Sequence, residues 1–469
     1  MTVLNPKAKY DVIQKDIPIR DFHLFKDEFV TRPPYQRKNV WSKNKQSDLI
    51  DSLFRRYYIP RIVLREIRLN SDTTVFEVID GQQRIITAQR YLNNELPMPK
   101  SLEDLFPGET GKFYKNLPAE IRRFVERDLI FTADLVKNID DPLKPEHQKI
   151  ATEIFYRLNQ GESLTFMEIA HSRLSSLVRN FIVKYADDQS FDFHKYKSID
   201  KNQFKHKFFS VISRNNNRMQ HLGLLARLLL LEKNYEINQA PCDIRDQMIM
   251  DYIDEFQLDN GIGNFSYETS PEAKEVIRLM NKFYKVFKDD PMIDENGGLK
   301  EFNIEYFIIS IFLLLRHIDK FYVFTEKEEK LFRDFVISFH QRWKEEKFEI
   351  DRDILYFAEN RQMSATEIGN RDRVIRQAFF EYVKDQNQQM LTKDERRVFN
   401  EAERIKIYRK FNGLCQKCLE EGKPEIEALV PWKEYDADHV IPFALGGRTM
   451  VENAQLLCRH HNRQKGIAI

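Results

Sequence analysis

The first 140 residues alternate between a helical and a strand-like spacing of apolar side chains. Apolar residues in the stretch 49–57 recur at helical spacing after Ser42, a good helix N-cap, and Pro60 is expected to end that helix. Two runs rich in β-branched residues follow at 61–67 and 74–79, and helical spacing then resumes. This alternation predicts an α/β region.

The chain becomes helical from about residue 145 onward. Amphipathic stretches there predict helices at 147–158, 166–185, 222–233, 270–288, 304–321 and 327–344. An aromatic stripe in this region is more typical of a helix core than of a ligand site, and consists of Phe302, Tyr306, Phe307 and Phe312. Residues 386–396 are polar and lack aromatic side chains, which is typical of a linker.

These patterns predict a multidomain α+β protein with three parts. Residues 1–175 should form an α/β domain, and residues 176–392 a largely helical domain that ends in the linker. Residues 393–469 should form a separate small C-terminal domain.

Three of the four cysteines cluster near the C-terminus. Cys415 and Cys418 form a CxxC pair, and Cys458 and His461 form a CxxH pair about forty positions later. This count and spacing match a closed tetrahedral zinc site, which would stabilise a domain of roughly 75 residues that can bury little core. A disulfide, or reduced cysteines that merely pack, is the alternative, and His460 competes with His461 as a ligand.

Polar residues with catalytic chemistry lie within the same segment. Asp438 and Asn462 offer hard oxygen ligands suited to Mg²⁺ or Mn²⁺. Neutral His439 can accept a proton from water at neutral pH, and Asn453 can orient the loop or His439. Two cations nearby are expected to contact DNA phosphates: Arg463 and Lys465.

Over about residues 398–469 the chain resembles the HNH nucleases of the ββα-metal superfamily. The resemblance places Asp438 and His439 at the opening of the first strand, Asn453 in the connecting loop and Asn462 on the following helix. It implies that His439 is the general base, that Asp438 and Asn462 bind catalytic Mg²⁺ or Mn²⁺, and that Asn453 is structural. Asn462 stands where many members have His. A zinc-stabilised nucleic-acid-binding knuckle without catalysis is the alternative.

A second polar cluster follows the predicted strand 74–79, and consists of Asp80, Gly81, Gln82, Gln83 and Arg84. A strand, a tight turn and a helix together present backbone N–H groups to an anion, and a guanidinium matches phosphate. The alternative is a capped turn with a surface Arg. Aromatic, amide and guanidinium groups precede it and are candidates for binding a base, sugar or phosphate: Tyr35, Gln36, Arg37 and Trp41.

These two clusters, followed by the stretch 155–165 (FYRLNQGESLT), resemble the N-terminal domain of GmrSD-type restriction enzymes over about residues 15–175. That family is distantly similar to the ParB and sulfiredoxin fold, and its DGQQR motif is associated with nucleotide binding and hydrolysis. The resemblance implies a role for Asp80, Gln83 and Arg84 at the phosphates of GTP or ATP. Some relatives use this domain to recognise modified phage DNA.

Overall charge adds little, because 31% of residues are charged yet the net charge is +1. DNA contacts must therefore come from local patches, of which 370–376 is the strongest. Basic stretches 201–207 and 214–218 are better explained as solvated faces. The stretch 108–112 is too short for a phosphate loop and is expected to be a surface turn.

The chain begins without an apolar signal core, and its longest apolar run, 307–315, is too short to span a bilayer. We expect a cytoplasmic protein with no membrane contact, a structural Zn²⁺, and DNA and a nucleotide as partners. A homo-oligomer or a partner protein of a defence system stays open.

The combination predicts a DNA endonuclease of an anti-phage restriction system, gated by nucleotide or by modified DNA. One alternative is a nucleotide hydrolase or nucleotide-switched protein whose HNH domain only binds DNA. Another is a toxin-like nuclease that degrades host DNA after infection.

Overall fold

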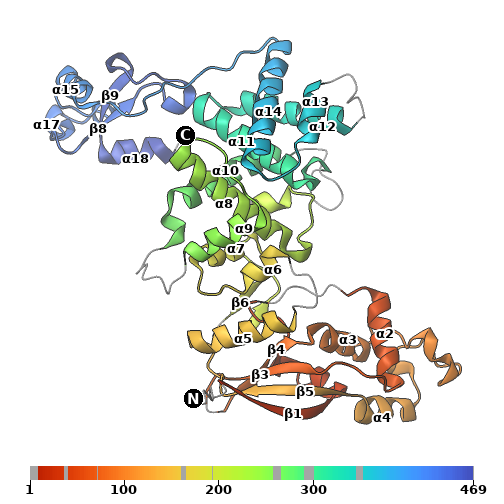
Figure 1. Ribbon diagram of the computed structural model, residues 1–469. Coiled ribbons are helices and arrows are strands. Elements are labelled where there is room, and N and C mark those ends of the chain that lie inside the picture. Colours follow the sequence, from red (N-terminus) through yellow and green to blue (C-terminus); the bar gives the residue numbers. More distant parts are fainter. Residues whose placement is uncertain are drawn as a thin grey trace, which may run out of the picture. The chain divides into compact units, whose positions relative to one another are not determined.

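The computed structural model describes residues 9–35, 41–70, 72–159, 165–192, 194–256, 266–289, 300–344 and 352–467 (Figure 1). The chain forms two compact units. One contains Met1–Gln239 and Asp243–Val276, and the other contains Ala240–Cys242 and Ile277–Ile469. The three-part division at 175 and 392 stays a prediction.

The first unit begins with a mixed five-stranded sheet of order β1-β5-β3-β4-β2. Its strands are β1 (Asp11–Pro18), β2 (Phe29–Val30), β3 (Ile62–Arg68), β4 (Thr74–Asp80) and β5 (Ile130–Lys137). The central pair β3 and β5 is parallel, whereas β3–β4 and β1–β5 are antiparallel. The mixed helix and strand content agrees with the prediction, while the likeness to the ParB and sulfiredoxin fold stays a prediction.

Helices cover both faces of this sheet, as the alternation of neighbouring strand residues requires. Val78 packs into a core with α1 (Ile19–Leu24), α2 (Lys43–Phe54), α3 (Gln82–Leu92) and α4 (Ala119–Asp128). Ile79, the next residue, packs on the other face against α5 (Pro145–Leu158). Figure 1 shows α5 lying along its face of the sheet. Strand β4 is thus enclosed on both sides, up to the residue where the polar motif begins.

Helix α2 begins where the sequence predicts and ends earlier. The Ser42 hydroxyl accepts a hydrogen bond from the Lys45 N–H, which confirms the cap. The last helical residue is Phe54, and the N–H of Arg55 bonds back to the Asp51 carbonyl. The prediction that Pro60 ends the helix is therefore wrong, because the chain leaves the helix five residues earlier.

A buried ionic cluster lies on the α5 side of the sheet. Arg65 and Glu77 have no exposed side-chain surface and face each other across β3 and β4 at 3.5 Å. Both Tyr35 and Tyr196 donate their hydroxyls to the Glu77 carboxylate. Burial raises the pKa of Glu77, and the Arg65 guanidinium opposes that shift. Because a charge buried without partners costs several kcal/mol, about 3–5 when one member of a pair is removed, these four side chains depend on one another.

The rest of the first unit is mostly helical and includes a short hairpin. Its elements are α6 (Phe166–His171), α7 (Leu177–Ala186), β6 (Ser190–Asp192), β7 (Lys197–Ile199), α8 (Gln220–Asn238) and α9 (Asp246–Glu255). The single helix predicted at 166–185 is two helices. The first ends at His171, and the second begins after Ser176, whose side chain caps α7 and also donates to the Ile253 carbonyl at 2.7 Å.

The helical part of the second unit confirms the aromatic stripe as core. Its helices are α11 (Glu305–Phe321), α12 (Glu326–Lys344), α13 (Arg352–Glu359) and α14 (Ala365–Asp385), preceded by α10 (Pro271–Phe287). Phe302, Phe307 and Phe312 are buried, and the Phe307 ring stacks on Trp343 at 5.4 Å between centroids. Among the described residues, no helix combines the length and apolarity needed to cross a membrane.

The predicted basic patch at 370–376 is not a cluster of exposed cations, because only Arg373 of its three arginines is exposed. Its residues lie within α14, where Arg371 is fully buried and donates to the carbonyl groups of Asn360 and Gln362. Arg376 is paired with Asp372 one turn earlier in the same helix. Charge along the sequence could not reveal this, since an Arg can be buried when carbonyl groups receive its donors.

The predicted linker at 386–396 is held in place over its second half. The Lys393 N–H donates to the Phe321 carbonyl at 2.8 Å, and the Val323 N–H donates to the Leu391 carbonyl at 2.8 Å. This short antiparallel pairing joins the end of α11 to the chain that enters the C-terminal region. A polar composition therefore does not make this stretch a free tether.

The C-terminal region has a ββα arrangement. It contains α15 (Glu401–Lys410), α16 (Gln416–Glu420), α17 (Glu425–Ala428), β8 (Tyr435–His439), β9 (Ala454–Cys458) and α18 (Arg459–Ile467). The two strands are antiparallel, with Tyr435 opposite Cys458 and His439 opposite Ala454. One position differs from expectation, because Asp438 and His439 close the first strand instead of opening it.

Candidate metal centre and nuclease site

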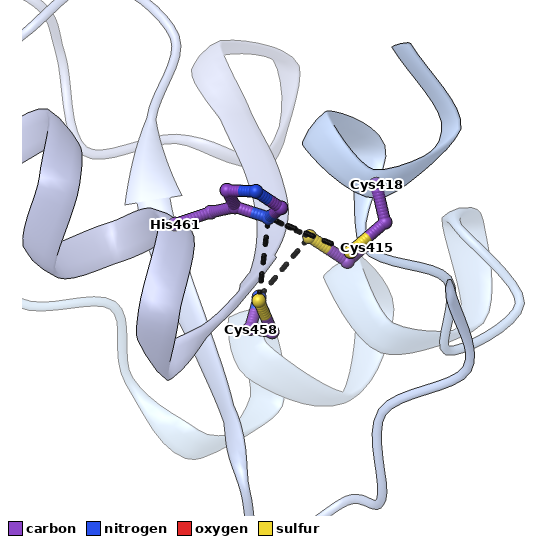
Figure 2. A group of neighbouring side chains, drawn as sticks. All are labelled: Cys415, Cys418, Cys458 and His461. Atoms are coloured by element: carbon purple, nitrogen blue, oxygen red, sulfur yellow. Dashed lines mark hydrogen bonds between the residues drawn. The ribbon is translucent and has the colours of Figure 1, made fainter. Parts of the chain in front are cut away.

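The two half-sites predicted for zinc meet at one point (Figure 2). Cys415 and Cys418 come from the start of α16, Cys458 from the end of β9 and His461 from α18. The His461 Nδ1 atom lies 3.4 Å from the Cys415 Sγ, 3.5 Å from the Cys418 Sγ and 3.3 Å from the Cys458 Sγ. All four donor atoms lie within 4.8 Å of one another.

This donor set fits a structural Zn²⁺ ion. Three thiol sulfurs and one imidazole nitrogen, gathered within 4.8 Å of one another, are the number and type of ligands that a tetrahedral zinc site uses. The Nε2 atom of His461 lies 3.0 Å from a Glu421 carboxylate oxygen, a contact that fixes the ring with Nδ1 toward the cysteines. Although burial acts to raise it, N–H groups of Cys418 and Cys458 lower the pKa of Cys415 to about 7.

Glu421 was missed by the sequence reasoning. The zinc motif specifies the four ligands and their spacing, and contains no rule for the residue behind the histidine. Lys423 also pairs with Glu421 at 3.0 Å and holds the pKa of this carboxyl below its usual range. Glu421 is therefore charged when it accepts the hydrogen bond from His461.

His439 lies at the end of β8 with 8% of its surface exposed. The ring packs against Phe399 at 4.6 Å between centroids, and its Nε2 atom lies 3.0 Å from the Thr449 hydroxyl oxygen. Burial lowers the pKa of His439, with Lys465 and Arg397 acting in the same direction and Asp438 against it. The imidazole is therefore neutral at pH 7 and able to accept a proton.

The two predicted ligands of the catalytic metal contact different partners. Asp438 accepts hydrogen bonds from Lys465 at 2.6 Å and Gln455 at 2.8 Å, both at the same carboxylate oxygen. The Asn462 amide nitrogen donates to Asp436 at 3.1 Å. Asn462 thus keeps its amide oxygen for a cation, and Asp438 offers carboxylate oxygen. These are donors that fit Mg²⁺ or Mn²⁺.

Two other residues of the segment differ in their surroundings. Lys465, predicted to contact phosphate, is placed against Asp438 and the His439 carbonyl. Arg463 is exposed on α18 and keeps its predicted role open.

Asn453 holds the loop that follows β8. Its amide oxygen accepts from the Ile441 N–H at 2.9 Å, and its amide nitrogen donates to the carbonyls of Ile441 at 3.2 Å and Arg448 at 3.0 Å. Gly447 fits under this loop only because it has no side chain, since a Cβ there would lie 1.8 Å from the Ile441 carbonyl oxygen. These contacts favour the structural role predicted for Asn453.

The N-terminal motif forms the predicted junction of strand, turn and helix. Asp80 ends β4, and Gly81 adopts a φ of 97° at the start of α3. A Cβ on Gly81 would lie 2.4 Å from the Ile62 Cγ2 atom, so the close approach of two strands also requires glycine. Arg84 forms an ion pair with Asp80 and donates to the Pro60 carbonyl at 2.6 Å.

The two glutamines complete this turn. The Gln83 amide oxygen accepts from the Trp41 N–H at 3.3 Å, and its nitrogen donates to Gln82 at 3.3 Å. Gln82 itself is 5% exposed. The structure therefore places Trp41 against the motif. Arg84, the cation of the motif, already forms an ion pair with Asp80.

The earlier cluster is only partly described. Tyr35 is 1% exposed and its hydroxyl donates to Glu77, so it lies in the core of the sheet domain. Gln36 and Arg37 lie outside the described residues, as do residues 160–164 of the third motif. A role for all these residues in ligand binding stays a prediction.

Comparison with protein families assigns both regions. The family model described as the GmrSD restriction endonuclease N-terminal domain matches residues 21–415. The chain belongs to the GmrSD N-terminal domain family. The HNH endonuclease model matches residues 415–467, directly after it. A search of curated proteins found no match.

The GmrSD match extends much further than the sequence motifs alone. The resemblance based on those motifs ends near residue 175, whereas the family model continues through the helical region to Cys415. The fusion of a GmrSD-type domain with an HNH domain is that of a restriction-type DNA endonuclease. DNA is accordingly its substrate, and the Cys₃His cluster lies within the HNH match.

Proposed function

We propose that this protein is a metal-dependent DNA endonuclease of a bacterial anti-phage system, restrained by its N-terminal domain. The observation that carries the proposal is the buried His439, which follows Asp438 at the end of the first strand of a ββα fold and whose pKa is lowered by burial. A neutral imidazole next to an oxygen ligand for a divalent cation is what hydrolysis of a phosphodiester by an activated water requires.

The side chains divide the work. His439 accepts the proton of the attacking water, and the hydrophobic contact with Phe399 keeps its ring in one orientation. Asp438 and Asn462 would hold Mg²⁺ or Mn²⁺, which when bound supplies positive charge to the scissile phosphate and the leaving oxygen. Exposed Arg463 contacts the DNA backbone. Cys415 and Cys418 would hold Zn²⁺ together with Cys458 and His461, which would fix α16 to the junction of β9 and α18.

The N-terminal domain supplies the restraint. Phosphate contacts carry no sequence information, so cleavage by this HNH domain would be nearly indiscriminate on its own. The turn between β4 and α3 presents backbone N–H groups at a helix start, next to Arg84, in the arrangement that binds phosphates. We place GTP or ATP, or a modified DNA phosphate, at Asp80–Arg84, and with it the signal that permits cleavage.

The test is Mg²⁺-dependent cleavage of modified and unmodified phage DNA, with and without GTP or ATP. His439→Ala should lower the rate about 10²- to 10⁴-fold, the usual contribution of a general base. His460→Ala is the matched control, because this neighbouring histidine is exposed on the same helix as the zinc ligand His461. Equal cleavage by His439→Ala and the wild type would contradict the assignment.

A second candidate rests on the ion pair between Lys465 and Asp438. A cation that is already part of the protein occupies one carboxylate oxygen, as expected if the HNH domain only grips DNA and the N-terminal domain hydrolyses or senses a nucleotide. In that case His439→Ala would leave DNA binding intact and no variant or wild type would cut. A host-directed toxin nuclease would instead cut unmodified host DNA equally well.

A further inference from the structure

The partner of the His439 ring is a buried hydroxyl. Thr449 has 2% of its surface exposed, and its Oγ1 atom lies 3.0 Å from the His439 Nε2 atom. The same hydroxyl donates to the Arg396 carbonyl oxygen. Thr449 thus connects the imidazole to a backbone carbonyl that precedes the nuclease fold in sequence.

The direction of these hydrogen bonds fixes the histidine tautomer. A threonine hydroxyl has one hydrogen, and a carbonyl oxygen can only accept, so that hydrogen points to Arg396. Toward His439 the hydroxyl oxygen must then accept, which places the imidazole hydrogen on Nε2. In the neutral ring the remaining lone pair is on Nδ1, and Nδ1 is the atom that can take a proton from water.

Thr449 is itself held by the chain that arrives from the helical region. Its N–H donates to the Asp394 carboxylate at 3.0 Å, and the other oxygen of that carboxylate accepts from the Arg396 N–H at 3.0 Å. We call residues 391–397 the entry segment. The entry segment therefore contacts Thr449 at three points, through its N–H, its hydroxyl and, at 3.5 Å, its carbonyl.

The other end of the entry segment is fixed to α11. Besides the pairing of Lys393 with Phe321, the Lys393 ammonium donates to the Asp319 carbonyl at 2.6 Å. The loop before Thr449 approaches the same place, since a Cβ on Gly446 would lie 3.0 Å from Val323. Hydrogen bonds at both ends of the entry segment, together with its own backbone, thus connect the end of α11 to the ring of His439.

We propose that Thr449 is a positioning residue for the general base, and that the entry segment holds Thr449 in the position that this role requires. The proposal rests on the function proposed for His439. It assigns to residues 391–397, which precede the HNH match at 415–467, the task of keeping Nδ1 as the proton acceptor. The helical region then sets the state of the base through Arg396 and Asp394.

The test compares Thr449→Val with Thr449→Ser in the full-length protein. Valine keeps the shape and removes the hydroxyl, whereas serine keeps the hydroxyl. Thr449→Val should lower kcat about 10- to 100-fold, the usual effect of removing an orienting partner, and Thr449→Ser should stay near the wild type. Equal zinc content and an unchanged unfolding temperature would show that the valine variant folds.

The decisive readout is the tautomer, measured by ¹⁵N NMR of the histidine side chains, with His439→Ala used to assign the signal among the 11 histidines. Wild type and Thr449→Ser should show hydrogen on Nε2, and Thr449→Val a mixture of tautomers. This measurement does not depend on cleavage. If the wild type never cuts, the proposed function fails while the tautomer still tests the positioning role.

Two further variants test the entry segment. Asp394→Ala removes the acceptor for the Thr449 N–H and should shift both the tautomer and kcat in the direction of Thr449→Val. Asp385→Ala is the control, because this aspartate is exposed and lies outside the entry segment. A pure Nε2–H tautomer and full activity in Thr449→Val would overturn the positioning role. Unchanged values in Asp394→Ala would overturn the role of the entry segment.

Discussion

The metal centre and the N-terminal motif differ in how far apart in sequence their residues lie. At the metal centre, Cys415 and His461 are 46 positions apart in sequence, yet their donor atoms lie 3.4 Å apart. At the motif, Asp80 and Arg84 are four positions apart and neutralise each other. Separate half-sites that converge bring four metal-ligating atoms together, a set that could hold a zinc ion. A contiguous motif can satisfy itself, so its structure alone does not require a ligand.

The same contrast decides how each site must bind. A zinc ion bound at the cluster would replace repulsion among thiolates by coordination. A phosphate at the motif must compete with the Asp80 carboxylate for the Arg84 guanidinium, and Arg84 also keeps its bond to the Pro60 carbonyl. We therefore expect the metal centre to govern stability and the motif to govern a weaker, reversible response.

Loss of zinc should have the largest effect. Cys418→Ser, or a strong chelator, should unfold the ββα region, because a structural zinc contributes roughly 10–16 kcal/mol in small zinc domains. Calorimetry and zinc analysis would measure this, and the transition of the sheet domain should persist. Cys242→Ser, which changes a cysteine outside the cluster, is the control. An unchanged unfolding profile in Cys418→Ser would show that the four residues only pack together and do not bind a stabilising zinc ion.

The motif should respond more modestly. Arg84→Lys keeps a positive charge and loses the forked donors, so GTP or ATP should bind about 1.5–3 kcal/mol more weakly, roughly 10- to 100-fold in Kd. Titration calorimetry measures the change. Arg90→Lys, on the same helix and paired with Glu95, should bind nucleotide like the wild type. Equal weakening by both variants would show a general effect of losing guanidinium groups on this helix. No weakening by either variant would contradict nucleotide binding at this turn.

The smallest effect is expected in the loop that follows β8. Asn453→Ala removes three hydrogen bonds to Ile441 and Arg448 and should lower the stability of the ββα region by about 1–3 kcal/mol. The unfolding temperature and the zinc content measure this, and zinc should stay bound. Exposed Glu452 provides the control, Glu452→Ala. If Asn453→Ala released zinc, the loop and the metal centre would be one unit and the ranking of effects would be wrong.

Features with a spacing rule could be predicted from the sequence. Helical periodicity located most long helices, Ser42 marked the start of α2, and paired cysteine spacings identified a cluster whose atoms do meet. The strand, turn and helix around Gly81 also followed from local residue types. In each case the information lies within a few neighbouring residues or in a repeated spacing.

Features that depend on distant partners could not be predicted. Glu421 and Thr449 act through His461 and His439, and no spacing connects them to those rings. Arg371 reads as a surface cation until its carbonyl acceptors are known. Tyr35 reads as a ligand contact, whereas its hydroxyl belongs to a buried ionic cluster formed by the fold.

The bond between Lys465 and Asp438 has a consequence for electroneutrality. A divalent cation that takes the same carboxylate oxygen must displace the ammonium group, so the site exchanges one positive charge for two. The displaced lysine is then free to meet the negative charge that arrives with the DNA backbone. Lys465 would therefore neutralise the Asp438 carboxylate in the free protein and a DNA phosphate in the complex with metal and DNA. A divalent metal ion should therefore bind more weakly in the absence of DNA than in its presence.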